Sequence, residues 1–339
     1  MKSVDRILEE ASGTQFTAAV ARIEHRGRVL YERAVGTTRA DEFARPVYCD
    51  TRFDLASLTK LFVTTLLLEL VAARRIGLDE SLARILPEWI EKPYDRITPR
   101  MLLAHTSGMN SGADYRTILD ENVERFALTT PLIAQPGERV IYSDLGFIVA
   151  GVAIERITRQ SLTAHVQRLS PGVIFRPRPA TRSAIPATEE DAWRGRVQGF
   201  VHDEKAYLMG GAAGHAGLFG TAADVAALAE CYLGKLHGRR STRLPGALVR
   251  EAITEQAWDP VLRRGLGWAL KTTDENSCGR FMDRASFGHT GFVGTCVWAD
   301  PARDVQGVLL TNAVYFGRAD TRDVRSRFYE AMIECVPSD

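Results

Sequence analysis

The sequence predicts an α+β fold in which one antiparallel sheet is built from both ends of the chain and flanked by helices. Near the start, residues 17–24 and 28–35 alternate between apolar and polar around His25-Arg26-Gly27, which predicts a β-hairpin. Near the end, residues 295–299 and 306–313 flank a second turn in the same way. Helical spacing dominates between these hairpins. Because antiparallel strands need only short connections, both hairpins can join one sheet, and the middle becomes an inserted helical lobe.

The predicted helices follow from apolar residues spaced three and four positions apart. They cover residues 4–11, 57–74, 79–86, 98–104, 144–158, 162–169, 222–236 and 321–336. Residues 170–193 hold several prolines without periodicity, which indicates a surface loop. We therefore expect a sheet lobe of residues 1–60 and 215–339, a helix-rich lobe of residues 61–214, and an active site between them.

Composition excludes several classes of partner. The 339 residues include 43 basic and 42 acidic side chains, which gives a formal charge of +1. A chain with so little net charge is not expected to attract nucleic acid or an anionic membrane surface. The longest apolar tract, residues 61–73, is too short for a bilayer and contains Glu69. The first residues contain charged side chains where a signal peptide would have an apolar run, and the five cysteines are widely scattered. These two features predict a reduced, cytoplasmic protein.

Ser57 and Lys60 open a predicted helix three positions apart, so their side chains share one face. A lysine can serve as base to a serine nucleophile if its pKa falls, and burial and the positive helix end both favour that. Only six of the 43 basic residues are lysine. Because arginine does not give up its proton, Lys60 indicates lysine-specific chemistry rather than a snorkelling surface charge.

Two further motifs could carry chemistry. Tyr142-Ser143-Asp144 precedes a predicted helix, where Ser143 or Asp144 is a natural N-cap. The functional interpretation makes Tyr142 a proton shuttle and Asp144 a polar contact to substrate or to Lys60. His289-Thr290-Gly291 precedes a strand predicted over 292–299, where glycine permits close backbone approach and His289 can offer a cation.

Together these three motifs resemble, in order and rough spacing, those of the serine β-lactamases and DD-peptidases. The chain is similar to the class C β-lactamase and penicillin-binding-protein-like family, a serine hydrolase family, over about residues 20–315. Supporting stretches are Phe53-Asp54-Leu55-Ala56, Leu102-Leu103-Ala104-His105-Thr106-Ser107-Gly108 and Gly214-His215-Ala216-Gly217-Leu218-Phe219-Gly220-Thr221-Ala222.

The resemblance implies a β-lactamase/transpeptidase-like fold and an acyl-enzyme route. Ser57 attacks an amide or ester carbonyl while Lys60 and Tyr142 move the protons; which of the two is the base stays open, because they titrate as one system. The resemblance also implies an oxyanion hole formed by the N–H groups of Ser57 and Phe292, the latter on the edge strand. It requires no metal or other cofactor.

The chain departs from this family at two positions. Family members commonly have asparagine where Asp144 stands, so Asp144 could pair with Lys60 instead of donating to substrate. They often have lysine where His289 stands, and a histidine near its reference pKa is partly charged at neutral pH. We therefore expect recognition of a substrate carboxylate by His289, Thr290 and Gly291 to depend on pH.

The run Val201-His202-Asp203-Glu204-Lys205-Ala206 resembles a subgroup that includes peptidoglycan-turnover amidases. If this run is a strand, neighbouring residues face opposite sides, so only one of His202 and Asp203 faces substrate, and His202 is the substrate-binding candidate. His105 is expected to hold its loop rather than react. Thr221 and Asp224 predict a capping box.

Other classes of protein fit less well. An α/β-hydrolase needs a G-x-S-x-G pentapeptide, which does not occur. A metallohydrolase could use His202, Asp203, His215 and His289, but their spacing matches no zinc motif. A binding protein without activity on the same scaffold is a further alternative, against which the joint presence of the three catalytic candidates argues.

The sequence therefore predicts a serine hydrolase that cleaves an amide or ester through an acyl-enzyme. Peptidoglycan fragments and other peptides with D-amino acids rank ahead of simple esters and β-lactams, because a cytoplasmic enzyme meets imported wall fragments. A carboxylesterase and a weak class C-type β-lactamase are the alternatives. The expected partner is a small-molecule or peptide substrate, with neither nucleic acid nor membrane.

Overall fold

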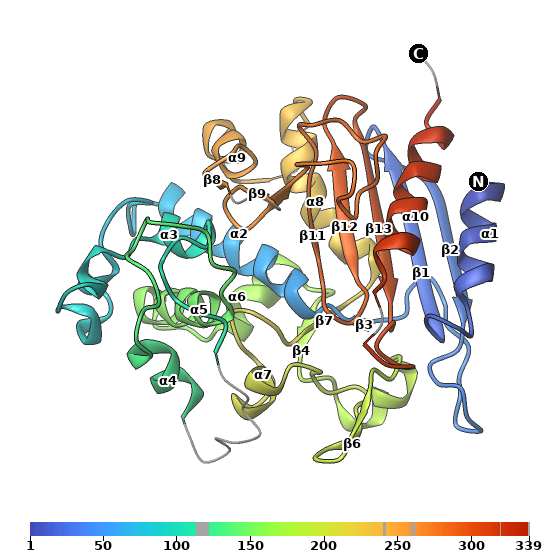
Figure 1. Cartoon of the computed structure of the whole chain (residues 1–339), viewed down its shortest axis with the longest axis horizontal. Coiled ribbons are helices and arrows are strands. Elements are labelled where there is room, and N and C mark those ends of the chain that lie inside the picture. Colours follow the sequence, from blue (N-terminus) through green and yellow to red (C-terminus); the bar gives the residue numbers. More distant parts are fainter. Residues whose placement is uncertain (113–121, 240–241, 259–261, 319, 338–339) are drawn as a thin grey trace.

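The central sheet of the chain contains strands from both termini. The computed structural model describes residues 1–112, 122–239, 242–258, 262–318 and 320–337. Its sheet has eight strands in the order β2-β1-β13-β12-β11-β10-β9-β8 (Figure 1). The strands are β1 (Ala18–His25), β2 (Arg28–Gly36), β8 (Ala257–Trp258), β9 (Arg263–Arg264), β10 (Ala269–Leu270), β11 (Phe287–Thr290), β12 (Cys296–Asp300) and β13 (Val305–Thr311). The first hairpin joins the last through β1 and β13, which confirms the predicted fold class.

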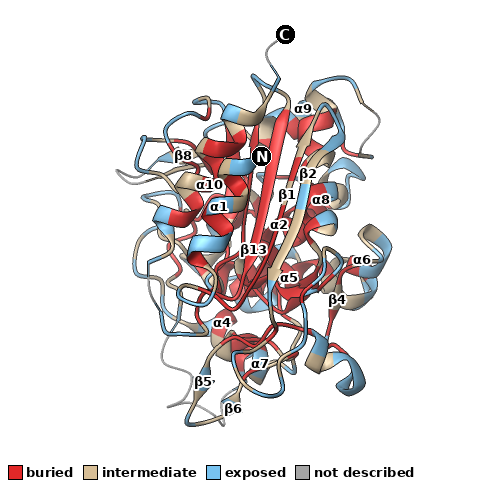
Figure 2. Cartoon of the chain, turned by 90° about the vertical axis from the view of Figure 1, so that its right-hand side faces the viewer, coloured by how far each residue is buried: buried red, intermediate tan, exposed pale blue. Residues whose placement is uncertain are grey.

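Helices cover both faces of this sheet. Alternate residues of β1 enter two cores: Val20 packs with α8 (Ala222–Leu236), whereas Ala19 and Ala21 pack with α1 (Lys2–Ala11) and α10 (Arg322–Cys335). This follows from the two-residue period of a strand. Figure 2 shows that β13 is buried along its whole length, whereas every residue of the edge strand β2 is at least partly exposed.

The helical region packs around α2 (Thr59–Ala72), whose first ten residues are buried on every side. It contacts α5 (Asp144–Thr158) and α6 (Leu162–Leu169). The other α-helices of the described chain are α3 (Pro99–Leu103), α4 (Val123–Thr129), α7 (Glu204–Leu208) and α9 (Gly246–Ala252). The division into two lobes stays a prediction. None of the described helices is long and apolar enough to cross a membrane.

Two local predictions are wrong. Residues 79–86 form no α-helix, only a 3-10 turn at Leu82–Arg84. The reason is that Ser81 caps this turn and Pro87 disfavours a helical Leu86 before it. Residues 170–193 are not simply a surface loop, because they contain β4 (Ile174–Phe175), a 3-10 helix and β5 (Glu190–Asp191), which pairs with β6 (Gly195–Arg196).

A small second sheet supports the start of α2. Its order is β3-β7-β4, with β3 at Phe53–Asp54 and β7 at Leu218–Gly220. These strands are too short to show periodicity in the sequence. Because β3 ends three positions before Ser57, its pairing with β7 fixes where the following turn leaves the sheet.

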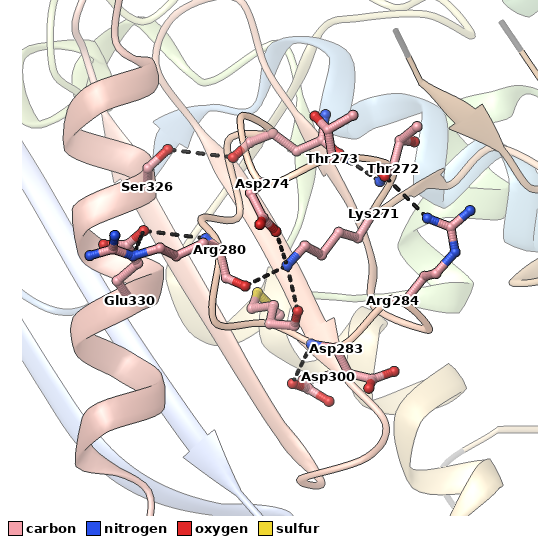
Figure 3. Close-up of polar contacts among 12 residues, drawn as sticks. Lys271, Thr272, Thr273, Asp274, Arg280, Asp283, Arg284, Asp300, Ser326 and Glu330 are labelled. Carbon is pink, nitrogen blue, oxygen red and sulfur yellow. Dashed lines mark hydrogen bonds and ion pairs between the residues drawn. The ribbon is translucent and has the colours of Figure 1, made fainter. Parts of the chain in front are cut away.

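The segment between β10 and β11 is held by a buried lysine. Figure 3 shows the Lys271 ammonium among backbone carbonyls: it donates to the oxygens of Arg280 at 2.7 Å and Met282 at 2.6 Å, and pairs with Asp274 at 3.2 Å. Nearby, the N–H of Asp283 donates to the carboxylate of Asp300 on β12 at 3.0 Å. Lys271 therefore holds several parts of this segment together through one ammonium, and Asp300 binds the segment to the sheet.

Candidate active site

Ser57 lies in a tight turn between β3 and α2. The preceding Ala56 has a φ of +46°, a left-handed conformation that is strained for a residue with a Cβ. Asp54 holds the turn: its carboxylate accepts from the N–H of Ala56 at 2.8 Å and from that of His202 at 2.7 Å. Burial raises the pKa of Asp54, although both hydrogen bonds favour its charged form. One carboxyl therefore fixes Ser57 and the His202 segment relative to each other.

The structure brings Ser57, Lys60 and Tyr142 together. Lys60 Nζ donates to Ser57 Oγ at 2.9 Å, and the Tyr142 hydroxyl donates to the same oxygen at 3.0 Å. Lys60 is 0% exposed and comes from the first turn of α2, while Tyr142 stands just before α5, which Ser143 caps as predicted. Nucleophilic catalysis by serine needs an adjacent group that can take its proton, and both Lys60 and Tyr142 are within hydrogen-bond distance of Ser57 Oγ.

The expectation that the pKa of Lys60 falls is wrong. Burial disfavours its ammonium, but the carboxylate of Asp144 at 2.9 Å and the neighbouring Tyr142 outweigh burial and raise that pKa. The three N–H bonds of the ammonium match three acceptors: Ser57 Oγ, Asp144 Oδ1 and the His215 carbonyl at 3.1 Å. Lys60 is therefore charged before substrate binds.

Asp144 faces two lysines rather than one. Its other oxygen lies 3.0 Å from Lys205 Nζ. Burial disfavours the carboxylate, but Lys60, His215 and Lys205 together lower the pKa of Asp144 to about 2. Sequence reasoning did not single out Lys205, although its position beside the His202-Asp203 pair and the scarcity of lysine were signals that could have found it.

His202 and Asp203 both line the cavity, contrary to the prediction that one of them turns away. The run is not a strand: Asp203 is the N-cap of α7 and accepts from the N–H of Ala206 at 2.9 Å. His202 Nε2 pairs with Glu189 at 3.0 Å, and its ring stacks on Phe292 with centroids 5.5 Å apart. The strand assumption failed because a short helix begins at Glu204, directly after its cap Asp203.

His289 cannot supply the expected cation near neutral pH. The His289-Thr290-Gly291 motif lies within and just after β11, and its histidine is 3% exposed. Burial, together with the charges of Lys60 and Arg264, lowers the pKa of His289 to about 3. Its Nδ1 lies 2.8 Å from the Thr290 carbonyl, a contact that fits a neutral ring donating from that nitrogen. The prediction that His289 is partly charged at neutral pH is therefore wrong, and the pH dependence of recognition that was expected from it loses its basis.

The strand predicted from residue 292 begins only at Cys296, so Phe292 lies in a turn. A Cβ on Gly291 would lie 2.1 Å from Thr295 Oγ1, which explains why glycine is needed there. Within the described residues, the backbone N–H groups of Ser57 and Phe292 donate to no other backbone group. Both residues line the cavity, so the two amides stay available for an oxyanion.

The cavity around Ser57 measures about 540 Å³. Its walls include Asp144, Thr290, Arg318 and Phe292, whose side chain is 56% exposed at the rim. A second cavity of about 370 Å³ adjoins it, and Tyr142 and Thr290 line both. A substrate at Ser57 therefore has room for polar groups on either side of its carbonyl.

The remaining sequence-predicted contacts are structural. His105 Nδ1 accepts from the N–H of Ser143 at 3.0 Å, which confirms that it holds its loop, and Thr221 with Asp224 forms the predicted capping box. The metal-binding alternative gains little support. Asp144, Asp203 and His215 lie close enough to share an ion, but the lysine ammonium groups already contact the carboxylates where an ion would bind. This donor set therefore does not fit a cation.

The family model described as Beta-lactamase matches residues 4–331. The chain belongs to the beta-lactamase family. It is 29% identical over 360 residues to an N-acetylmuramyl-L-alanine amidase of Bacillus subtilis, covering 92% of this chain and 80% of the relative. It is 28% identical over 370 residues to a putative D-alanyl-D-alanine carboxypeptidase of Escherichia coli K12, covering 94% and 84%.

Two solved structures are similar to this chain in fold. A class C beta-lactamase from Rhodobacter sphaeroides superposes with a TM-score of 0.78 at 16% identity, covering 98% of this chain and 99% of that one. EstCE1, a hydrolase with promiscuous acyltransferase activity, gives 0.75 at 21% identity, with 97% and 98% covered. With the family match and the curated relatives, this chain is a serine hydrolase of beta-lactamase fold.

Proposed function

We propose that this serine hydrolase cleaves an amide bond in peptidoglycan fragments or related peptides with D-amino acids, through an acyl-enzyme on Ser57. The observation that carries the chemistry is Ser57 Oγ between Lys60 Nζ at 2.9 Å and the Tyr142 hydroxyl at 3.0 Å, beside a cavity of about 540 Å³. The substrate class is supported by the names of the amidase and carboxypeptidase relatives.

In the proposed route Ser57 Oγ attacks the carbonyl carbon and passes its proton to the Lys60–Tyr142 pair. The carbonyl oxygen becomes an oxyanion facing the N–H groups of Ser57 and Phe292, each of which typically contributes about 2.7–4 kcal/mol. The pair returns the proton to the leaving nitrogen as the C–N bond breaks. Water then attacks the ester carbonyl and gives a proton to the same pair, which passes it to Ser57 Oγ as the ester C–O bond breaks and the acid product leaves.

Charge on Lys60 shapes the first step. Because the nitrogen of an ammonium has no lone pair, Lys60 accepts no proton until it has given one up. The Lys60–Tyr142 pair therefore acts as a base only in the form that has lost one proton. Asp144, which holds Lys60, is proposed as a positioning group, and Thr290, Gly291 and His202 as substrate contacts.

The test is mass spectrometry of the intact protein with three classes of substrate: a muropeptide panel, short acyl esters and β-lactams. Wild-type protein is expected to cleave at least one muropeptide and to carry a transient adduct on Ser57, while Ser57→Ala loses about 10⁴-fold or more in turnover. Turnover of esters with no cleavage of any muropeptide would replace this proposal with a carboxylesterase, and rapid β-lactam hydrolysis alone with a β-lactamase.

The proposal also places the enzyme in the cytoplasm, where it meets imported fragments. All five cysteines are free, which fits a reducing compartment. Cell fractionation with an antibody to the chain checks this, and recovery with the exported proteins would contradict it. Activity that persists in EDTA is the expected result for chemistry without a metal.

A further inference from the structure

Five contacts form a closed ring behind Ser57. Asp144 bridges the two ammonium groups, with Lys60 Nζ at 2.9 Å and Lys205 Nζ at 3.0 Å. Lys205 Nζ continues to Asp203 at 3.5 Å, and Asp203 to His215 Nε2 at 2.7 Å. The His215 carbonyl accepts from Lys60 Nζ at 3.1 Å, which returns the ring to its start.

The ring connects four separate pieces of chain: the start of α2, the start of α5, α7, and the segment before β7. Lys60 and His215 are almost fully enclosed, whereas the side chains of Lys205 and Asp203 are 11% and 21% exposed. Groups in such a setting interact strongly, because little water screens them. Replacing one member of the ring therefore changes the orientation of its neighbours and the electrostatic potential at their charged groups.

Lys205 takes no part in the bond-making steps, but it is the ring member that contacts both carboxylates, Asp144 and Asp203. Without Lys205, the only lysine paired with Asp144 would be Lys60. A carboxylate stabilises one ammonium more strongly than it stabilises each of two, so Lys60 would give up its proton less readily. Lys205 also fixes Asp144 Oδ2, which leaves Oδ1 directed at Lys60. Its second contact, to Asp203, anchors it from the far side.

We propose that Lys205 is a positioning residue for the Ser57 chemistry: by sharing Asp144 with Lys60 and closing the ring through Asp203, it keeps Lys60 aligned and able to release its proton. This inference rests on the proposed role of Lys60 but not on the proposed substrate. It concerns acylation of Ser57 by any reactive carbonyl compound.

The test is the pH profile of acylation by p-nitrophenyl acetate. Lys205→Met removes the shared cation, so the ascending limb of the profile moves to higher pH and the rate near neutrality falls, by about 100-fold if Lys60 is also misplaced. Asp203→Asn removes an anion, so Lys205 then pairs with Asp144 only. With less negative charge near Lys60, its ammonium gives up a proton more readily, and the ascending limb moves to lower pH. Lys205→Arg keeps the charge and restores the limb toward the wild-type position.

Opposite shifts separate this role from simple loss of stability, which would move both variants the same way or neither. The groups that face Lys60 from the surrounding elements, and that none of the variants replaces, are Tyr142, Asp144, His215, His289 and Arg264. Lys271→Met is the matched control, since it removes a buried ammonium remote from the ring, and its limb is expected to coincide with wild type.

Limbs that stay in place, or that move in the same direction in Lys205→Met and Asp203→Asn, overturn the inference. If Lys205→Met does not fold, Asp203→Asn alone decides, because only a downward shift of the limb supports the ring. Failure of the proposed substrate class is seen separately, as an absence of muropeptide cleavage by wild-type protein that still reacts with p-nitrophenyl acetate.

Discussion

Two buried lysines, Lys60 and Lys271, have nearly the same exposure and very different surroundings. Lys60 is 0% and Lys271 is 6% exposed. The Lys271 ammonium is surrounded by the carbonyls of Arg280 and Met282 and an exposed Asp274, none of which can react. Lys60 instead contacts the Ser57 hydroxyl, the half-buried carboxylate of Asp144 and a carbonyl. Burial of a lysine therefore does not mark catalysis; the chemical type of its partners does.

The comparison also corrects the argument from composition. An arginine-rich chain that retains a lysine suggests a reason for it, but Lys271 shows that the reason can be steric. A compact ammonium with a flexible stem can be surrounded by carbonyls that a planar guanidinium would not fit. The composition argument selects positions worth inspecting, and geometry then decides which of them carries chemistry.

Replacing each lysine with arginine gives the largest expected difference. Lys60→Arg keeps the charge but cannot give up a proton, so kcat/KM for p-nitrophenyl acetate should fall about 10³-fold. Lys271→Arg should lower stability, but the folded variant should keep kcat/KM within about twofold of wild type, because none of the groups that contact Lys271 reacts. The measurement is steady-state kinetics on both folded variants. Equal losses in the two would erase the distinction drawn between the sites.

Removing the structural ammonium should affect stability instead of rate. Lys271→Met leaves the carbonyls of Arg280 and Met282 without their donor, at roughly 1–3 kcal/mol for each of the two groups, so the free energy of unfolding should fall by about 2–6 kcal/mol. Urea unfolding measures this loss. At 25 °C the folded variant should turn over substrate at the wild-type rate, and a tenfold slower rate would show that the segment also shapes the active site.

Sequence periodicity predicted the long elements well. The two hairpins and the helices 144–158, 162–169 and 222–236 appear within a few residues of their predicted ends, because each buries a continuous apolar face. Two-residue strands such as β3, β4 and β10 carry no period, so they could not be predicted. Their positions depend on long-range pairing that a local pattern does not contain.

The same limit applies to the active site. Ser57, Lys60 and Tyr142 could be found because their motifs have fixed spacing and chemistry. The role of Lys205 depends on α7 approaching α5, which nothing in the sequence states. The charge states of Lys60 and His289 were mispredicted because each depends on burial and on neighbours from other elements. Residue identity can be read from a motif, but protonation follows from the assembled surroundings.

Acid stability distinguishes the catalytic region from the Lys271 region. Burial is the main cause that lowers the pKa of His105 and of His289, the latter to about 3, whereas unfolded histidine titrates near about 6.5. The unfolded chain therefore binds more protons below pH 6.5, and stability is lost as pH falls from there toward 3, by at most about 1.4 kcal/mol per unit for each histidine.

The carboxylate of Asp144, with a pKa of about 2, adds a loss only below about pH 3.8. Urea unfolding at pH 7, 6, 5 and 4 gives the free energy of unfolding as a function of pH. In wild type this free energy should fall with falling pH as the histidines predict, and in His289→Gln it should fall less steeply. Lys271→Met should lower the whole curve with its slope unchanged. A slope that is the same in His289→Gln and wild type would show that His289 is not held neutral.

The smallest expected effect is no change at all, in the binding of a substrate carboxylate. A histidine near pKa 6.5 would go from mostly charged at pH 5.5 to mostly neutral at pH 8, and KM would rise several-fold. Because the pKa of His289 is lowered to about 3, it is neutral across this range, and KM for a muropeptide with a free carboxylate should stay flat. An uncharged amide of the same peptide is the matched control. A rise confined to the carboxylate form would mean that substrate itself recharges His289, which requires the bound anion to overcome the burial and the nearby cations Lys60 and Arg264 that now keep the ring neutral.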